Sequence, residues 1–416
     1  MKKIAQIILN LSTKITLRRN KYNVVAITGS VGKTSTKKAV SLVLREKYKV
    51  LSFEEEGYNT EIGLPLILLE EKIPKSKFGW LKLIIISPFV ALKKRDYDYA
   101  VLEMGADRPG DIEYLTSLAK PDIAIITNVS GVHLENFGTV EDIAKEKEKI
   151  LSALTNGGTA IINIDSDFIS KITVPTGIKK LTFGKHSNDI KIIKQDFQAD
   201  GSKNYLKVYG KDLILNSVAL GEHILYIFAA AVAVGISEKV ETNVISAGLE
   251  KYTPVRGRLN IIKGVNGSIL IDDSYNASPE SMKNALDILE KFLGKKKIAV
   301  LGTMGELGIE EKRAHEEIGS YLTGKCDILV TVGDVAKKHL AKSALAAGFP
   351  RENVFSFHDS SSAGKYLKGI LKSKDVVLLK GSQNAARMEK AVKEIMKEPG
   401  KASVLLCRQG KEWRKR

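Results

Sequence analysis

Residues 28–35, with the sequence TGSVGKTS, constrain what this chain can fold into more than any other segment. They follow the apolar run 24–27 and precede a helical pattern, which predicts a strand, a glycine-rich loop and a helix. Glycines let such a loop fold around a phosphate, while backbone N–H groups, the helix N-terminus and Lys33 face the anion. A strict Walker A motif has another glycine where this chain has Ile27, so the loop is a variant. The residues expected to form this nucleotide site are Gly29, Ser30, Val31, Gly32, Lys33, Thr34 and Ser35.

Apolar runs of strand length alternate with helical patterns along almost the whole chain, which predicts parallel sheets with crossover helices. The strands expected in the first half are 24–27, 99–102 and 123–126, and those in the second half are 269–271, 298–301, 328–332, 354–357 and 376–379. A second strand–helix series begins after 253–254, so two α/β domains divided near residue 253 are expected. Residues 179–217 look more β-rich and are expected to form an antiparallel edge of the first domain.

Composition and charge exclude several classes of protein. The 416 residues are 44% hydrophobic and 27% charged, which fits a globular protein and excludes a disordered chain. Its two cysteines, Cys326 and Cys407, form no metal-ligand or disulfide pattern, so a reducing compartment and a cytoplasmic location are expected. The net charge is +17, yet aromatic residues are sparse at 6% and no zinc-finger, RRM or KH pattern is present, so nucleic acid is not an expected partner.

An apolar run, WLKLIIISPFVAL at residues 80–92, lies among basic residues. It is too short to span a bilayer and is interrupted by Lys82 and Pro88. A helix packed on the domain surface is the favoured interpretation. The alternative is peripheral contact of about residues 76–95 with an anionic membrane face.

Two further polar residues follow predicted strands. Glu103 ends the strand at 99–102, and His133 comes soon after the strand at 123–126. Because ligands of open α/β sheets bind at the carboxyl ends of the strands, these residues and Thr34 are expected at one site. Carboxylate and hydroxyl oxygens suit Mg²⁺, so the three residues predict a metal–nucleotide site.

The order of these motifs resembles the Mur ligase family. The first half contains TGSVGKTS, GYNTEIGLP, LEMGAD, HLE before FG, and the helical segment IAKEKE. The second half contains IDDSYNASPESM, VLGTMGELG, and KGS followed by RMEK, which resemble the family branch that adds D-alanyl-D-alanine. The motifs extend in register from about residue 22 to 392.

The resemblance implies a fold and an activity. The fold would be α/β, with a basic linker helix at 1–21, a P-loop ATP-binding domain with a mostly parallel sheet at 22–252, and a Rossmann-like C-terminal domain at 253–416. An apolar insertion at about 74–95 would interrupt the central domain. The activity would be an ADP-forming, ATP-dependent peptide ligase that adds D-Ala-D-Ala to UDP-MurNAc-tripeptide through an acyl phosphate, in peptidoglycan precursor synthesis.

The resemblance also implies roles for individual residues. Thr34 and Glu103 would hold one Mg²⁺, and His133 with a carbamoylated Lys147 would hold a second, with Lys145 as the alternative for the modified lysine. The implied catalytic residues are Lys33, Glu103, His133 and Lys147. Further nucleotide contacts would come from Arg258, Asp273 and Asn276, and substrate contacts from Asn59, Lys380 and Ser382.

This sequence departs from the family pattern in three places. Only 27 residues precede the glycine-rich loop, where the family has a UDP-binding domain, so UDP recognition is expected to be weaker, relocated or supplied by a partner chain. Ile224 and Ile227 replace asparagines near the adenine, and Gln383 replaces an arginine. Two alternatives therefore stay open: a Mur-type ligase acting on a different or lipid-linked carboxylate, and a nucleotide-binding protein without ligase activity.

Overall fold

The computed structural model describes residues 2–53, 58–74, 76–130, 134–198, 200–410 and 413. The chain forms two compact units. The first unit comprises residues 1–194, 204–216 and 222–252, and the second comprises 195–203, 217–221 and 253–416.

A nine-stranded sheet has the order β2-β3-β1-β4-β5-β6-β7-β8-β9. Its strands are β1 (Asn23–Thr28), β2 (Val50–Leu51), β3 (Tyr99–Glu103), β4 (Ile123–Ile126), β5 (Thr159–Asn163), β6 (Lys179–Gly184), β7 (Ile190–Gln198), β8 (Gly201–Val208) and β9 (Lys211–Ser217). Strands β2 to β6 pair in parallel. The central strand β1 pairs with both β3 and β4, so their carboxyl ends meet at one edge of the sheet.

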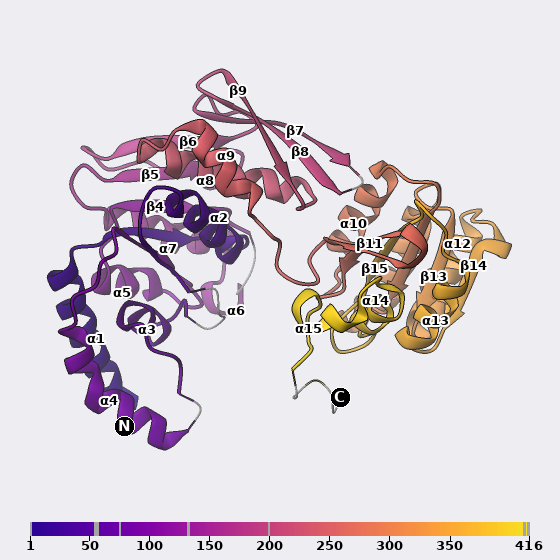
Figure 1. The fold of residues 1–416 in the computed structure, drawn as a ribbon, viewed down its shortest axis with the longest axis horizontal. Helices are drawn as coiled ribbons and strands as arrows, with labels where there is room; N and C mark the ends of the chain where they lie inside the picture. Colours follow the sequence, from indigo (N-terminus) through magenta and orange to yellow (C-terminus); the bar gives the residue numbers. More distant parts are fainter. Residues whose placement is uncertain are drawn as a thin grey trace. The chain divides into compact units, whose positions relative to one another are not determined.

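Helices cover both faces of this sheet because β1, β3, β4 and β5 are apolar on both sides (Figure 1). One face packs against α1 (Lys2–Asn20), α3 (Gly63–Leu69), α4 (Lys77–Ala91), α5 (Asp111–Leu118) and α7 (Val140–Ser152). The helices α2 (Lys33–Arg45), α8 (Glu222–Ser237) and α9 (Thr242–Glu250) pack against one another. The short helix α6 spans Leu134–Phe137.

The second unit is built on a six-stranded sheet with the order β10-β11-β15-β12-β13-β14. Its strands are β10 (Asn260–Lys263), β11 (Ile269–Asp273), β12 (Lys297–Gly302), β13 (Ile328–Val332), β14 (Val354–Phe357) and β15 (Val376–Lys380). All neighbours are parallel except β10 and β11. Alternate strand residues belong to two separate apolar clusters, as expected for a sheet buried on both faces.

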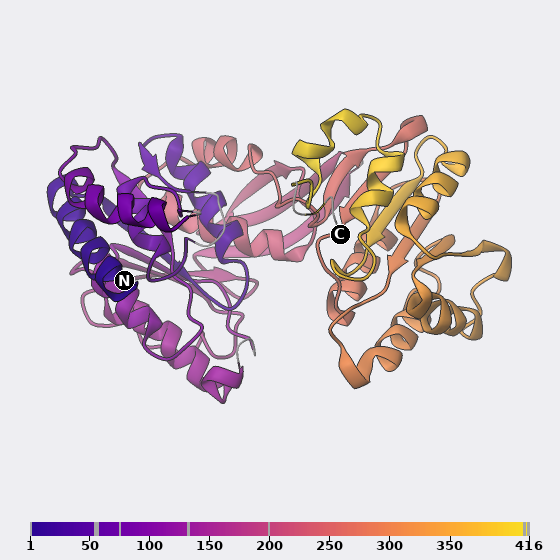
Figure 2. The same ribbon diagram turned by 90° about the horizontal axis from the view of Figure 1, so that it is seen from below.

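Each cluster of the second unit includes its own helices (Figure 2). One contains residues of α10 (Pro279–Lys291), α11 (Glu311–Tyr321) and α12 (Lys342–Ala346). The other contains residues of α13 (Ser360–Ile370), α14 (Glu389–Ile395) and α15 (Ala402–Leu405). The predicted doubly covered α/β fold is confirmed, and all eight predicted strands are present.

The structure corrects one expectation and places two further segments. Residues 179–217 are β-rich as predicted, but β6 pairs in parallel with both β5 and β7, so they do not form a wholly antiparallel edge. Segment 1–21, which was expected to be a basic linker helix, contains the helix α1, and α1 packs into the first unit through the buried Leu9. The apolar segment forms α4 on the surface of the same unit. Within the described ranges, no helix is long and apolar enough to cross a membrane.

Candidate active site

The glycine-rich loop joins β1 to α2 as predicted, and Lys33 is the first residue of α2. The Lys33 ammonium donates hydrogen bonds to the carbonyl oxygens of Gly29, at 2.8 Å, and Ser30, at 3.3 Å. Burial lowers the Lys33 pKa, and the nearby Glu103 and Asp107 charges partly oppose this effect. The ammonium therefore lies over its own loop, in the position where phosphate oxygens are bound in loops of this kind.

The conformation of the loop depends on glycine at two positions. Gly32 has φ +83°, in the left-handed region that favours glycine. Gly29 has φ +151°, and a Cβ atom there would lie 2.0 Å from Thr127 Oγ1. Thr127 Oγ1 in turn donates to the Val31 carbonyl oxygen at 2.7 Å. Ser30 N donates to the Asn128 carbonyl oxygen at 2.7 Å, so the segment after β4 holds the loop.

Thr34 and Glu103 meet at the carboxyl ends of β1 and β3. Thr34 Oγ1 donates to Glu103 Oε2 at 2.8 Å, and Asn59 Nδ2 donates to Glu103 Oε1 at 3.2 Å. The buried Lys37 ammonium lies 4.0 Å from Glu103 Oε2. A hydroxyl and a carboxylate oxygen at this distance form a donor set that suits Mg²⁺. The structure thus brings together the predicted residues Thr34, Glu103 and Asn59.

Helix α7 brings Lys147 to the same region of the first unit. Lys147 is 2% exposed, and its pKa is lowered to about 8 by burial and, secondarily, by the Lys33 charge. The next basic residue towards the N-terminus, Lys145, has a side chain that is 76% exposed. Of these two lysines of α7, Lys147 is therefore the buried one, and its charge interacts with that of Lys33. The neighbouring Glu146 has a structural role. Its Oε1 accepts a hydrogen bond from Ile112 N at 2.9 Å, and this bond joins α5 to α7.

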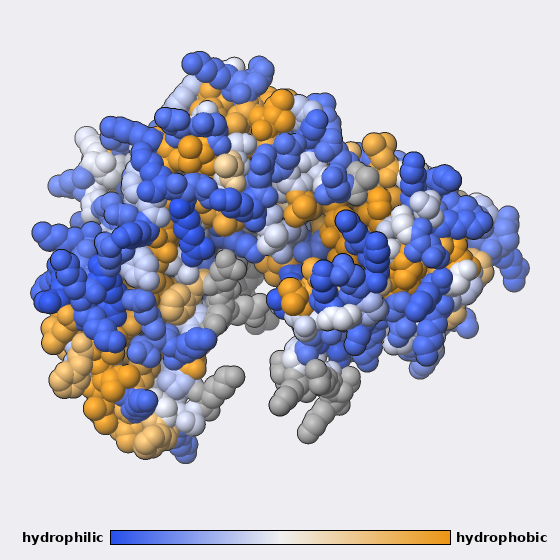
Figure 3. Space-filling view, in the orientation of Figure 1, coloured by the Kyte–Doolittle hydropathy of each residue, from blue (hydrophilic) through white to orange (hydrophobic). Residues whose placement is uncertain are grey.

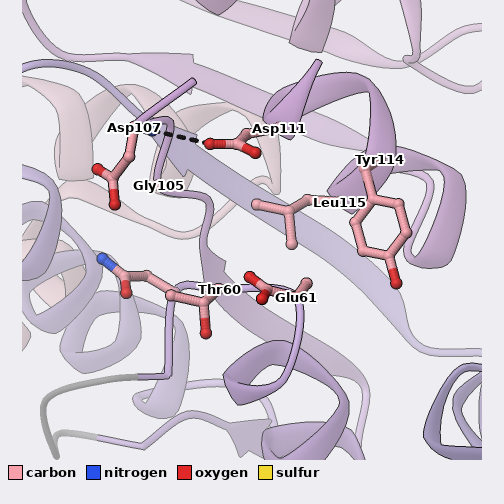
Figure 4. A pocket seen from close by; sticks show the side chains of 8 residues that line it. Thr60, Glu61, Gly105, Asp107, Asp111, Tyr114 and Leu115 are labelled. Carbon is pink, nitrogen blue, oxygen red and sulfur yellow. Dashed lines mark hydrogen bonds between the residues drawn. The ribbon is translucent and has the colours of Figure 1, made fainter. Parts of the chain in front are cut away.

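A pocket lies beside this site (Figure 4). Its lining is mostly polar and includes Asn59, Glu61, Asp107, Asp111 and Tyr114. Asp111 Oδ2 accepts from Asp107 N at 2.9 Å, which fixes the turn that carries Asp107. Asn59 thus has one contact with Glu103 and also faces a pocket that could receive a polar substrate group.

The second unit contains the other predicted nucleotide-binding and substrate-binding residues. Asp273 and Lys380 are register partners on β11 and β15, and their side chains form a buried ion pair at 2.6 Å. Lys380 Nζ also donates to the Asn276 carbonyl oxygen at 2.9 Å. Arg258 lies over the Tyr275 ring, 4.6 Å from its centroid. The structure therefore gathers Asp273, Asn276 and Lys380 into one cluster.

The remaining predicted residues differ in how far the structure describes them. Ser382 is buried, and its N–H donates to the Thr303 carbonyl oxygen at 3.0 Å. Ile224 and Ile227 are buried in α8, so these apolar departures have a packing role. The predicted ligand His133 lies outside the described residues. Across the described part of the chain, no group of three or more His, Cys, Asp or Glu residues is arranged to hold a metal.

Sequence reasoning missed two residues of the first unit's site. Lys37 lies one helical turn after Lys33 on α2, and this spacing was the signal that both lie on one side of the helix. Asp107 belongs to the LEMGAD motif, and its charge partly opposes the lowering of the Lys33 and Lys147 pKa values by burial. Both residues add charge beside the predicted phosphate site.

Two family models match the chain. The Mur ligase middle domain matches residues 27–235, and the Mur ligase glutamate ligase domain matches residues 257–383. The region matched by the middle domain contains the glycine-rich loop, Glu103 and Lys147. The region matched by the glutamate ligase domain contains Asp273 and Lys380.

Relatives named UDP-N-acetylmuramoyl-tripeptide–D-alanyl-D-alanine ligase cover most of the chain. Those from Escherichia coli K12 and Bacillus subtilis 168 are each 30% identical over 378 residues. The matched region covers 89% and 90% of this chain, respectively, and 76% of each relative.

Solved structures give the same result. MurF from Thermotoga maritima, in complex with ADP, is 28% identical with a TM-score of 0.72, covering 95% of this chain and 84% of that one. A MurF structure from Acinetobacter baumannii is 26% identical with a TM-score of 0.75, covering 93% of this chain and 79% of that one. Family models that cover both units, relatives at 30% identity and a shared fold lead to one conclusion: the chain belongs to the Mur ligase family.

Proposed function

We propose that the protein adds D-alanyl-D-alanine to UDP-N-acetylmuramoyl-tripeptide in an ATP-dependent reaction that releases ADP and phosphate. The relatives that carry this activity in their names match both units of the chain. The observation that carries the proposal is the contact between Thr34 and Glu103 beside the half-buried Lys33 and the buried Lys37. A nucleotide phosphate and a metal need this combination of hydroxyl, carboxylate and ammonium groups.

The proposed reaction has two steps. The tripeptide carboxylate attacks the γ-phosphate of ATP, which forms an acyl phosphate and breaks the bond to ADP. The amino group of D-alanyl-D-alanine then attacks the acyl carbon, so an amide forms, phosphate leaves and the amine loses a proton. Several anionic oxygens must approach one another in the first step, and the charges of Lys33 and Lys37 with the loop N–H groups would offset their repulsion.

Thr34 and Glu103 are the residues that would hold Mg²⁺, and both supply the hard oxygen donors that this ion prefers. Bound there, Mg²⁺ would neutralise charge on the phosphates. The Thr34–Glu103 hydrogen bond keeps both groups at the carboxyl ends of their strands. Asn59 supports this arrangement by donating to the second Glu103 oxygen.

Lys147 is proposed to carry a carbamate. Carbamate formation requires the neutral amine, which attacks CO₂, forms the N–C bond and releases a proton. A pKa of about 8 makes a much larger neutral fraction available near neutral pH than an ordinary lysine has. The product is an anion beside Lys33, so it would replace a repulsion between two ammonium groups by an attraction. The modified side chain would also offer oxygen ligands to a second Mg²⁺.

Phosphate release tests the proposal. The full chain is incubated with ATP, Mg²⁺ and UDP-N-acetylmuramoyl-tripeptide, with and without D-alanyl-D-alanine. We expect release that depends on both substrates and falls by at least about a hundredfold in Glu103→Gln, since a transition-state charge contact is lost. The control is Glu113→Gln, which neutralises an exposed glutamate of α5. Absence of turnover in the native chain, or equal effects of the two substitutions, would overturn the proposal.

A further inference from the structure

Two helices of the first unit carry exposed apolar residues in regular stripes. Those of α1 are Ile7, Leu11 and Ile15, and those of α4 are Phe78, Leu81, Ile85 and Phe89, followed by Leu92 at the C-cap. Intervals of three and four residues put each set along one side of its helix. These eight residues are called the apolar face below. Figure 3 shows apolar residues gathered over α1 and α4, which Figure 1 shows side by side.

Helix α4 is apolar on two sides, and the first unit covers only one of them. Leu83, Ser87 and Val90 are buried, whereas Phe78 and Phe89 are 77% and 71% exposed. A surface helix in water normally presents polar residues on its outer side. Exposed aromatic residues at regular helical spacing therefore indicate a surface that binds something apolar.

The structure keeps α4 intact across Pro88. Proline has no N–H group to donate to the Ile84 carbonyl oxygen four residues earlier. Ser87 Oγ donates to that same oxygen at 3.2 Å. This replacement matters in an apolar environment, because no water is available there to satisfy the carbonyl group. The helix accordingly continues to Ala91 and carries the stripe as far as Leu92.

The ends of the two helices are fixed to each other. Asn20, the last residue of α1, accepts from Arg95 N at 2.7 Å and donates to the Lys93 carbonyl oxygen at 3.4 Å. The Arg95 side chain donates to the Val90 and Leu69 carbonyl oxygens at 3.2 and 3.1 Å, joining the ends of α4 and α3. The two stripes therefore belong to one continuous surface.

Basic residues accompany the apolar face. Lys14, Arg18, Arg19, Lys82, Lys93 and Lys94 are all exposed. Neither segment 2–21 nor segment 72–95 contains an aspartate or a glutamate. Protein–protein interfaces are typically depleted in lysine, whereas lysine is well suited to anionic lipid headgroups. Its long apolar stem lets the ammonium group reach the headgroups while the neighbouring residues are buried.

We propose that the apolar face is a docking surface for an anionic lipid bilayer. The stripes of α1 and α4 insert at the boundary between headgroups and acyl chains, with both helices lying in the plane of the membrane. The exposed lysines and arginines contact lipid phosphates around them. This inference does not depend on the ligase activity proposed above, and its test measures no turnover.

The experiment is flotation of the full chain with vesicles on a density gradient. One set of vesicles is pure phosphatidylcholine, and the other contains phosphatidylcholine and phosphatidylglycerol in equal parts. We expect the chain to float only with the second set, and less strongly as salt is added. Trp80 lies on α4 and is one of two tryptophans, so a Trp413→Phe variant should show a blue shift of Trp80 emission on binding.

Paired substitutions separate this surface from general effects. Phe78→Ser with Phe89→Ser should weaken vesicle binding by at least about tenfold. In the native chain both phenyl rings leave water on binding, and the variant loses this burial of apolar surface. Lys93→Gln with Lys94→Gln should weaken it by about fivefold for each charge removed.

The matched controls lie on the second unit. They are Leu293→Ser, where the side chain is 68% exposed, and Lys337→Gln with Lys338→Gln, where both lysines are exposed. These controls should float like the native chain.

Three results would overturn the proposal. The first is no flotation with anionic vesicles, and the second is equal binding by the apolar-face variants and the native chain. The third is a native oligomer, seen by light scattering, that Phe78→Ser with Phe89→Ser dissociates while neither form binds vesicles. In that last case, a second copy of the chain covers the face. Far-ultraviolet circular dichroism of each variant shows whether the fold is retained.

Discussion

Substitution of Lys147 by methionine should stabilise the protein while it abolishes the proposed ligase activity. Methionine is similar in length to lysine and apolar, so it fills the same buried position without a charge. Lys147 is 2% exposed and lies near the Lys33 ammonium, which makes its protonated form unfavourable in the folded state. A residue selected only for stability would not be a charged amine in that position.

The lowered pKa gives the size of the effect. Lysine has an ordinary pKa of 10.5, and that of Lys147 is about 8. Each tenfold change in acid dissociation corresponds to about 1.4 kcal/mol, so protonated Lys147 costs the folded state about 3 kcal/mol. Below pH 8 the amine is protonated in both states, and the whole cost applies. Between pH 8 and 10.5 the unfolded state binds more protons, so native stability rises with pH and the cost disappears.

The assay is urea unfolding of the native chain and of Lys147→Met in buffer free of CO₂, at neutral pH and at pH above 10. At neutral pH, methionine should raise the free energy of unfolding by up to about 3 kcal/mol, and the difference should shrink at high pH. A loss of stability at neutral pH, or a difference that does not change with pH, would refute this reasoning.

Activity provides the second half of the test. Lys147→Ala should lose phosphate release, and short carboxylates that fit the vacated space should restore part of it, because they replace the anionic carbamate. Lys145→Ala is the matched control and should stay active, since its side chain is exposed. Full activity of Lys147→Ala without added carboxylate would assign the role to another residue.

Two further substitutions test packing at the predicted sites. Gly29→Ala should lower the free energy of unfolding by about 1–3 kcal/mol or more and weaken ATP binding, because the added Cβ would overlap Thr127 Oγ1. Gly110 also has a positive φ but has open space around it, so Gly110→Ala should lower the free energy of unfolding by only about 1 kcal/mol. Equal losses of stability in urea unfolding would contradict the overlap at Gly29. Asp273→Asn should destabilise the second unit by about 3–5 kcal/mol, because it leaves the buried Lys380 ammonium without a carboxylate. Adding Lys380→Met should recover much of that loss, and a double variant as unstable as the single one would show that the ion pair is not the cause.

The fold could be predicted from the sequence because its signals are local. Strands buried on both faces appear as nearly continuous apolar runs, so 123–126 and 328–332 match the observed strands residue for residue. The half-buried edge strand 354–357 also matches the prediction. The glycine-rich loop was equally clear, since Gly29 and Gly32 adopt backbone conformations that other residues rarely take. Strand order is not a local property, so no pattern in the sequence predicted that β15 lies between β11 and β12.

The site was harder to predict because it depends on which side of each helix is buried. In the charged run of α7, Lys145 and Lys147 look alike, and only the packing of α7 shows that Lys147 is the buried one. Lys380 was expected to bind substrate, and the structure adds its ion pair with Asp273, which forms because their strands are neighbours. The outer stripe of α4 was equally ambiguous, because the helix is apolar on both sides.

The most direct test of the proposed function is the mass of the product formed from ATP, UDP-N-acetylmuramoyl-tripeptide and D-alanyl-D-alanine. We expect a single new species whose mass equals that of the two substrates minus one water, formed in step with ADP. A sample in which ATP is consumed without that species, or in which no ATP is consumed, would contradict the assignment of this carboxylate and this amine to the protein.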